Sequence, residues 1–231
     1  MSLPADARIK PVASFEELVT TRFADGVNAL CWERSLPGDF AEVAAALGTG
    51  EGVVALDERR LLRLRLSPAG QSARDVLIAD LHRLRTHRLQ PELNCIHGYP
   101  RDDAAGPVPT DVFSFHADSA PVEADTYLCT YHGSPSEGLP NEQAIRRTED
   151  PVTRAALRAQ FGPGDDAAFD EWLRENCHDL HYAPRPGAQP WSFGHGHLWR
   201  IALERPGSPV PPCIHRAPAT IAGQPRLLLI S

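Results

Sequence analysis

The chain of 231 residues has no excess of basic residues and no apolar run near the roughly 18 residues of a membrane helix. Its 23 Lys plus Arg against 30 Asp plus Glu give a formal net charge of −7. Nucleic-acid binders usually present a basic face, so this charge disfavours a nucleic-acid partner. The absence of an apolar run predicts no membrane partner. Lys10 is the only lysine, which indicates a coding bias and carries no functional inference.

Cysteine is scarce, and the chain has no Cys-x-x-Cys pair. The count is odd and the spacing wide, which favours reduced thiols over a disulfide framework and predicts a cytoplasmic protein. The five cysteines are Cys31, Cys95, Cys129, Cys177 and Cys213.

Length and hydrophobic pattern predict a single domain over 1–231, mixed and β-rich with helices. An N-terminal support, 1–90, carries expected helices at 14–22, 37–48 and 72–88 and a strand at 59–66; Asp39 is placed to cap the second helix. Residues 91–231 predict a sandwich or barrel, because short β-like runs alternate with Gly/Pro-rich turns. A helical insertion at about 141–178 interrupts it, as two helices joined by 161–165. The expected strands are 92–99, 111–116, 125–132, 180–184, 191–204, 210–215 and 225–230.

Four residues suggest the chemistry: His116, Asp118, His215 and Arg226. Two imidazoles and one carboxylate can occupy one face of a ferrous ion and leave the opposite face open. His116 and Asp118 are two apart, so on an extended strand they project to the same side. Arg226 would reach inward beside His215 if the two C-terminal strands were antiparallel neighbours. Its guanidinium would then clamp a free carboxylate.

The stretch from His116 to Arg226 resembles the Fe(II)/2-oxoglutarate-dependent dioxygenases, whose motif is His-x-Asp, a distant His and an Arg or Lys about ten residues later. The resemblance implies a double-stranded β-helix, or jelly-roll, core. It implies that His116, Asp118 and His215 bind Fe(II), that Arg226 anchors 2-oxoglutarate, and that O2 is consumed. Related halogenases lack the carboxylate, so Asp118 favours oxygenation.

One position departs from the pattern, because Leu228 stands where some branches carry a serine that shares the cosubstrate carboxylate. Tyr127, Thr130 and Tyr131, on the strand that follows His-x-Asp, are the candidates for the missing hydroxyl.

The expected substrate is a small molecule, an amino acid or related metabolite, oxidised at a C–H bond. Hydroxylation is the default outcome, with desaturation or cyclisation as alternatives. The candidate substrate-binding residues are Asn94, His97, Arg101, Glu142, Arg146 and His197, with Glu137 and Arg147 in the same segment.

Two other patterns compete for the metal. His195-Gly196-His197 resembles the cupin pair, but Glu204 is seven residues away instead of three or four. Cys95-Ile96-His97 and Cys213-Ile214-His215 offer zinc-type ligands, although zinc sites normally use Cys-x2–4-Cys knuckles. The alternative function is therefore a non-enzymatic β-barrel that binds a small ligand or is stabilised by zinc.

Overall fold

The computed structural model describes residues 6–101 and 106–231 and shows a mixed α/β fold, with many antiparallel strands in two curled sheets. Only β1 and β2 pair in parallel among the assigned strand pairs of the described chain. In order across it, the seven-stranded sheet contains β1 (Ile9–Val12), β2 (Ala29–Trp32), β11 (Leu198–Ala202), β6 (Asp125–His132), β13 (Arg226–Ile230), β4 (Glu92–Ile96) and β3 (Val53–Leu56).

The six-stranded sheet is antiparallel throughout and built from shorter strands. In order across it, these are β10 (Trp191–Ser192), β7 (Glu137–Leu139), β12 (Ile214–Arg216), β5 (Phe115–His116), β9 (His181–Pro184) and β8 (Ala144–Arg146).

Alternating side chains give the seven-stranded sheet an outer and an inner face, as the two-residue period of a strand requires. On β6, Tyr127 and Tyr131 belong to the outer core, which the N-terminal helices cover, whereas Leu128 belongs to the core between the sheets. Phe193 and Cys213 close that inner core. The inner face of β6 therefore looks toward the six-stranded sheet.

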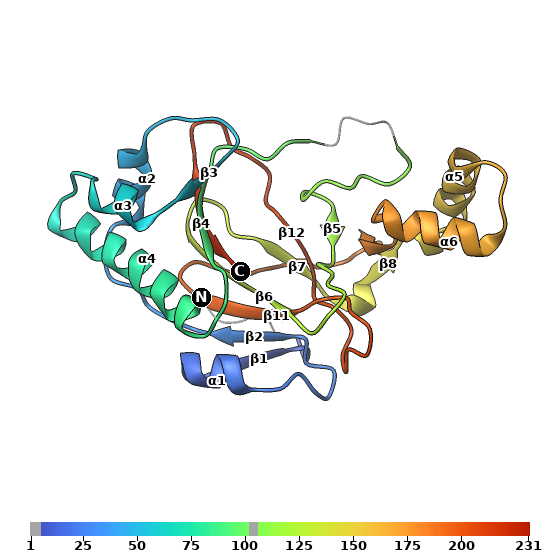
Figure 1. Ribbon diagram of the computed structural model, residues 1–231, viewed down its shortest axis with the longest axis horizontal. Helices are drawn as coiled ribbons and strands as arrows, with labels where there is room; N and C mark the ends of the chain where they lie inside the picture. The colour runs from blue at the N-terminus through green and yellow to red at the C-terminus, as the bar shows by residue number, and fades with distance from the viewer. Residues whose placement is uncertain (1–5, 102–105) are drawn as a thin grey trace.

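The N-terminal helices pack against the outer face and lie together on one side of the molecule (Figure 1). They are α1 (Phe15–Thr20), α2 (Phe40–Leu47), α3 (Glu58–Leu62) and α4 (Pro68–Thr86). Each begins at a Ser or Asp whose side chain accepts a backbone N–H of the first turn, the usual N-cap interaction: Ser14, Asp39, Asp57 and Ser67.

A buried ion pair ties α4 to the back of the sheet. The Arg34 Nη1 donates to both carboxylate oxygens of Asp80 at 2.8 Å, and the Tyr131 hydroxyl donates to Asp80 Oδ2 at 2.7 Å. Arg83 completes the set, and Arg34 Nε donates to the carbonyl of Gly196 in the turn before β11. Asp80 is 1% exposed.

The remaining helices, α5 (Pro151–Phe161) and α6 (Asp166–Glu175), lie at the opposite end of the molecule from α2–α4 (Figure 1). They share a small core with Val108. Three 3-10 helices flank them: η1 (Asn141–Gln143), η2 (Arg147–Glu149) and η3 (His178–Leu180).

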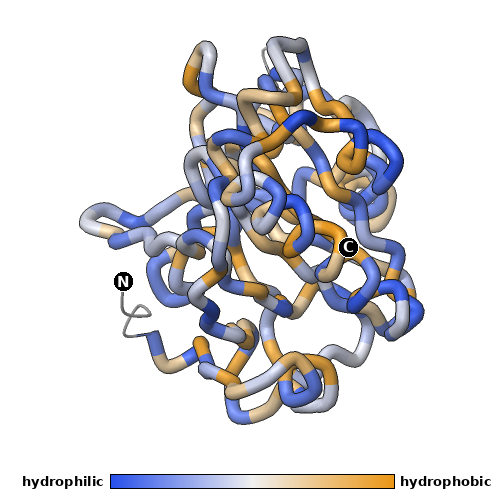
Figure 2. Tube along the Cα trace, turned by 90° about the vertical axis from the view of Figure 1, so that its left-hand side faces the viewer, coloured by the Kyte–Doolittle hydropathy of each residue, from blue (hydrophilic) through white to orange (hydrophobic). Residues whose placement is uncertain are grey.

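Along the trace, hydrophobic and hydrophilic stretches alternate closely (Figure 2). Among the helices of the described residues, none is both long and apolar enough to span a bilayer.

The structure confirms several sequence predictions, including the three N-terminal helices, the Asp39 cap and the two insertion helices. The strand expected at 59–66 is wrong: Asp57 caps a helix there, and its alternating Arg and Leu include a helical turn with Leu61 buried. The expected 191–204 strand is two strands in different sheets, because Gly194 and Gly196 adopt positive φ between them. The insertion becomes helical only at Pro151, after η1, β8 and η2.

The buried ion pair gives a stability prediction. Asp80→Asn leaves Arg34 with an uncompensated buried charge, so the free energy of unfolding falls by about 3 to 5 kcal/mol in urea denaturation. Asp75→Asn is the matched control on the same helix, because its side chain is 65% exposed. We expect that control to change stability by less than about 0.5 kcal/mol. Equal losses in the two variants would contradict the role assigned to Asp80.

Candidate metal centre

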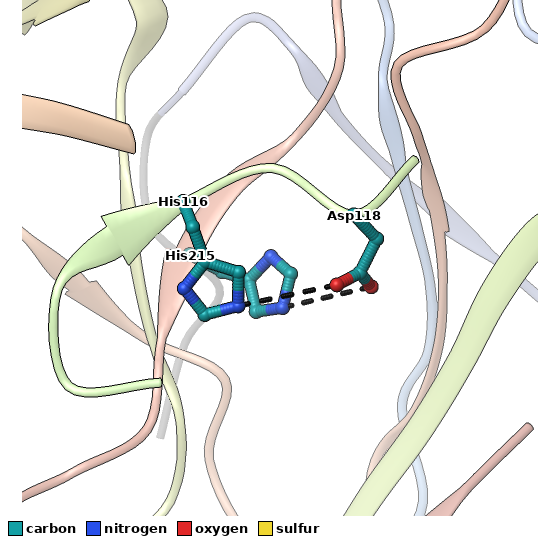
Figure 3. Close-up of side chains that lie close together, drawn as sticks. All are labelled: His116, Asp118 and His215. Atoms are coloured by element: carbon teal, nitrogen blue, oxygen red, sulfur yellow. Dashed lines mark ion pairs between the residues drawn. The ribbon is translucent and has the colours of Figure 1, made fainter. Parts of the chain in front are cut away.

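Three side chains of the six-stranded sheet and its flank converge between the sheets: His116 on β5, His215 on β12 and Asp118 just beyond β5. One ligand atom from each lies within 4.8 Å of the others. His215 and His116 are directly paired across the antiparallel strands, so they project to the same face. Figure 3 shows the two rings side by side with a nitrogen of each directed at the Asp118 carboxylate.

Backbone carbonyls orient both rings. The Nδ1 of His116 lies 2.8 Å from the carbonyl of Ser114, and the Nδ1 of His215 lies 3.3 Å from the carbonyl of Cys213. A carbonyl only accepts, so each Nδ1 carries a proton, and in the neutral tautomer that this selects the lone pair is on Nε2. Those Nε2 atoms lie 3.9 and 3.8 Å from the Asp118 carboxylate oxygens. A cation between them would accept electron pairs from all three groups, which otherwise present lone pairs to one another.

Asp118 is held by strand β6. The Thr126 hydroxyl donates to Asp118 Oδ2 at 2.6 Å, and the Glu204 amide donates to the Asp118 carbonyl at 2.8 Å. Burial alone would raise the pKa of this carboxyl, but the Thr126 hydrogen bond and the positive charge of His215 and His116 when they are protonated lower it. The carboxylate is thus ionised and oriented, as a metal ligand must be.

A third histidine continues the row. His181 on β9 is the direct partner of His116 and is 5% exposed, with the two ring centroids 5.8 Å apart. Burial, with neighbouring imidazoles, lowers the pKa of both His116 and His181 to about 4. Both rings are therefore neutral at pH 7.

Arg226 approaches from the seven-stranded sheet, because β13 pairs with β4 and β6. The expected pairing of the His215 and Arg226 strands is wrong: β12 pairs with β5 and β7 in the other sheet. The guanidinium donates to Ser136 Oγ at 2.7 Å, Thr130 Oγ1 at 3.0 Å and the Tyr99 hydroxyl at 3.4 Å.

The Arg226 side chain is 5% exposed, and its Nε has no hydrogen-bond partner within the described structure. Gly133 permits this approach: a Cβ there would lie 2.9 Å from Arg226 Cα, and its φ is +78°.

Of the three hydroxyl candidates, Thr130 contacts Arg226, and Tyr127 and Tyr131 do not. The prediction that Tyr127 or Tyr131 supplies this hydroxyl is wrong. They lie on the outer face of β6, where Tyr131 bonds Asp80 and Tyr127 packs in the outer core. A strand presents alternate residues to one face, so Thr130 and its tyrosine neighbours cannot serve the same site.

Most of the candidate substrate-binding residues lie away from the His116, Asp118 and His215 cluster. Glu142 forms an exposed ion pair with Arg8, and His197 accepts the amide of Arg34. His97 contacts Cys95 and lines a cavity of about 520 Å³ beside α2, on the outer face.

The remaining three candidates also differ in position. Arg146 lies on the face of β8 opposite the histidines, stacked over Tyr182 and paired with Glu204 at 3.0 Å. Asn94 is buried on the inner face of β4, and Arg101 stacks on Phe113. Asn94 therefore faces the space between the sheets, where a substrate-binding residue is expected.

The competing metal patterns do not converge. Among the residues that the structure describes, the only cluster with metal-ligand geometry is His116, Asp118 and His215. Cys95 and His97 lie on the outer side of the seven-stranded sheet, and Cys213 is in the inner core. His195 Nε2 contacts the Gly133 carbonyl at 2.6 Å instead of sharing a ligand site with His197.

A comparison with known proteins found no matching family model, no similar curated protein and no similar solved structure. The geometry of the site therefore carries the functional argument alone.

Sequence reasoning missed Thr126, His181, Ser136 and Tyr99. Only Thr126 had a visible signal, since it shares the strand parity of Thr130. The others depend on strand register and loop path, which spacing in the sequence does not reveal.

Thr126 supplies a direct test of ligand orientation. Thr126→Val removes the hydroxyl that positions Asp118 but keeps the shape, so divalent-metal affinity falls about 10- to 100-fold in a calorimetric titration. Thr20→Val is the matched control, because that hydroxyl bonds only its own helix and is remote from the site. An unchanged metal affinity in Thr126→Val would remove the positioning role.

The lowered pKa values of His116 and His181 predict acid sensitivity of the metal-free protein. Their pKa values are lower in the folded chain, about 4, than the ordinary 6.5. The unfolded chain then binds more protons between pH 4 and 6.5, and stability falls as pH is lowered through this range. We expect the free energy of unfolding to drop between pH 6.5 and 4, and His181→Gln to flatten that slope. A steeper slope in His181→Gln would contradict the prediction.

Proposed function

We propose that the protein is a non-heme Fe(II)- and 2-oxoglutarate-dependent oxygenase that oxidises a C–H bond of a small molecule, with the two curled sheets forming a jelly-roll core. The observation that supports it is the pair of imidazole Nε2 atoms directed at one half-buried carboxylate, with a buried arginine on the facing sheet. A divalent cation satisfies this donor set.

The ligand types suit ferrous iron. Two imidazoles and one carboxylate on one side keep three adjacent coordination positions open, and this set is characteristic of non-heme iron oxygenases. Zinc in structural sites prefers four protein ligands, and only three converge here among the described residues. His116, His215 and Asp118 would hold the metal.

Arg226 would bind the distal carboxylate of 2-oxoglutarate. It has no acidic partner among the described ion pairs, and burial lowers its pKa, so an incoming carboxylate would offset an uncompensated charge. Thr130 and Ser136 hold the guanidinium from one side. The cavity against Arg226 and Tyr99 is about 20 Å³, room for one water, so 2-oxoglutarate binding requires neighbouring side chains to move.

When bound, Fe(II), 2-oxoglutarate and O2 would supply oxidation of a substrate C–H bond to C–OH, with succinate and CO2 as co-products. The chain's part is to hold the reactants: burial keeps His116 neutral, and Thr126 keeps Asp118 oriented. The structure supports hydroxylation no more than desaturation or cyclisation.

The test is anaerobic addition of Fe(II) and 2-oxoglutarate to the purified protein. We expect a weak visible charge-transfer band, which His116→Ala or Asp118→Ala abolishes together with succinate formation in air. Arg226→Gln should keep iron binding but raise the 2-oxoglutarate requirement at least ten-fold, because it removes a charge-assisted hydrogen bond. Arg216→Gln, whose side chain pairs with Glu137 at 2.6 Å, is the control.

Two results would contradict the proposal. One is the absence of the band with tightly held zinc instead, which would favour the non-enzymatic zinc-stabilised barrel. The other is full turnover by Asp118→Ala, which would remove the ligand assignment.

A further inference from the structure

The row of histidines across the six-stranded sheet extends to an arginine. His215 pairs with His116 and His116 pairs with His181, so all three project to the inner face. The next strand, β8, ends where Arg146 pairs with Tyr182, and η2, which begins at Arg147, packs against β9 beside His181. Arg147 is near enough to contribute to the lowered pKa of His181.

Arg147 has no ion pair in the described chain, although part of its guanidinium is buried. The side chain is half-buried, its Nε is buried without a hydrogen bond, and no ion pair involves it in the described chain. Arg146, the preceding residue, is satisfied on the opposite face by Glu204. His181 also has a buried Nδ1 without a partner in the described structure.

We propose that Arg147 and His181 bind a carboxylate of the small-molecule substrate, next to the His116–Asp118–His215 centre. This inference rests on the proposed function and specifies its substrate class as a carboxylic acid. The guanidinium supplies the charge and a planar pair of donors, and the neutral imidazole of His181 adds one further hydrogen bond. Bound in this way, the acid lies in the row that ends at the metal ligands.

A carboxylate fits this pair better than a phosphate ester. One guanidinium and one neutral imidazole offer a single positive charge, which balances a monoanion. A phosphate monoester carries about 1.5 to 2 negative charges at pH 7 and would remain undercompensated.

The experiment is an anaerobic calorimetric titration of protein loaded with Fe(II) and 2-oxoglutarate. The probes are amino acids, 2-hydroxy acids and short aliphatic acids, each with its primary amide, and a set of phosphate monoesters. We expect the wild-type protein to bind one or more acids at least ten-fold more tightly than the matching amide, about 1.4 kcal/mol. Arg147→Gln should lose that preference, and Arg147→Lys should restore part of it.

Arg146→Gln is the matched control, since it changes the neighbouring arginine on the other face of β8. It should keep the acid preference. His181→Gln should weaken acid binding less than Arg147→Gln does, because it removes a hydrogen bond and no charge. Circular dichroism of each variant checks that it folds.

The outcomes separate this inference from the proposed function. Normal Fe(II) and 2-oxoglutarate binding without any acid preference overturns the inference and leaves the oxygenase proposal intact. An Arg147-dependent acid preference in protein that binds neither Fe(II) nor 2-oxoglutarate supports the carboxylate site and removes the oxygenase. Tighter binding of phosphate esters than acids, or an equal loss in Arg146→Gln, overturns it. A 2-oxoglutarate affinity that depends on Arg147 as strongly as on Arg226 also overturns it.

Discussion

The antiparallel register of β12, β5 and β9 is the constraint on which the candidate site depends. It places His215 opposite His116 and His116 opposite His181, all on the inner face. A slip of one residue would turn each imidazole to the outer face and bring Phe115 and Tyr182 inward. Two carbonyls then select which ring nitrogen faces Asp118. The geometry of this candidate metal site is thus set by backbone pairing first and by side-chain conformation second.

Strand β6 contacts both the candidate metal site and the buried Arg226. Thr126 bonds Asp118 and Thr130 bonds Arg226, and the two threonines share the inner face of one strand. Four residues of extended chain separate them by about 13 Å. The outer face of the same strand is fixed by Tyr131 and the Arg34–Asp80 pair, so α4 holds in place the strand that sets this spacing.

The residue types of the site were readable in the sequence, but their relation in space was not. His-x-Asp, a second His and a following Arg indicate metal and carboxylate chemistry because few other side chains supply those donors. The sequence could not show that Arg226 belongs to the other sheet, since spacing along the chain carries no register between distant strands. Side chains on a strand alternate between its two faces, so choosing Thr130 as the hydroxyl partner of Arg226 would have excluded Tyr127 and Tyr131 from that role. The strand predicted at 59–66 was wrong for a related reason. A short Arg/Leu alternation fits a strand, but the side chain of Asp57 caps a helix that begins at Glu58.

Charge compensation links the two proposals. Asp118 and Asp111, whose charges act on the row of histidines, supply the negative charge near the candidate centre. Arg226 and Arg147 have no ion pair within the described structure, and Arg226 is the more deeply buried of the two. Burying a guanidinium without an anion costs free energy, so this cost is larger at Arg226 than at the half-buried Arg147. Each proposal therefore assigns a carboxylate to one of these guanidiniums, 2-oxoglutarate to Arg226 and the substrate to Arg147, and an amide or ester substrate would leave Arg147 without that partner.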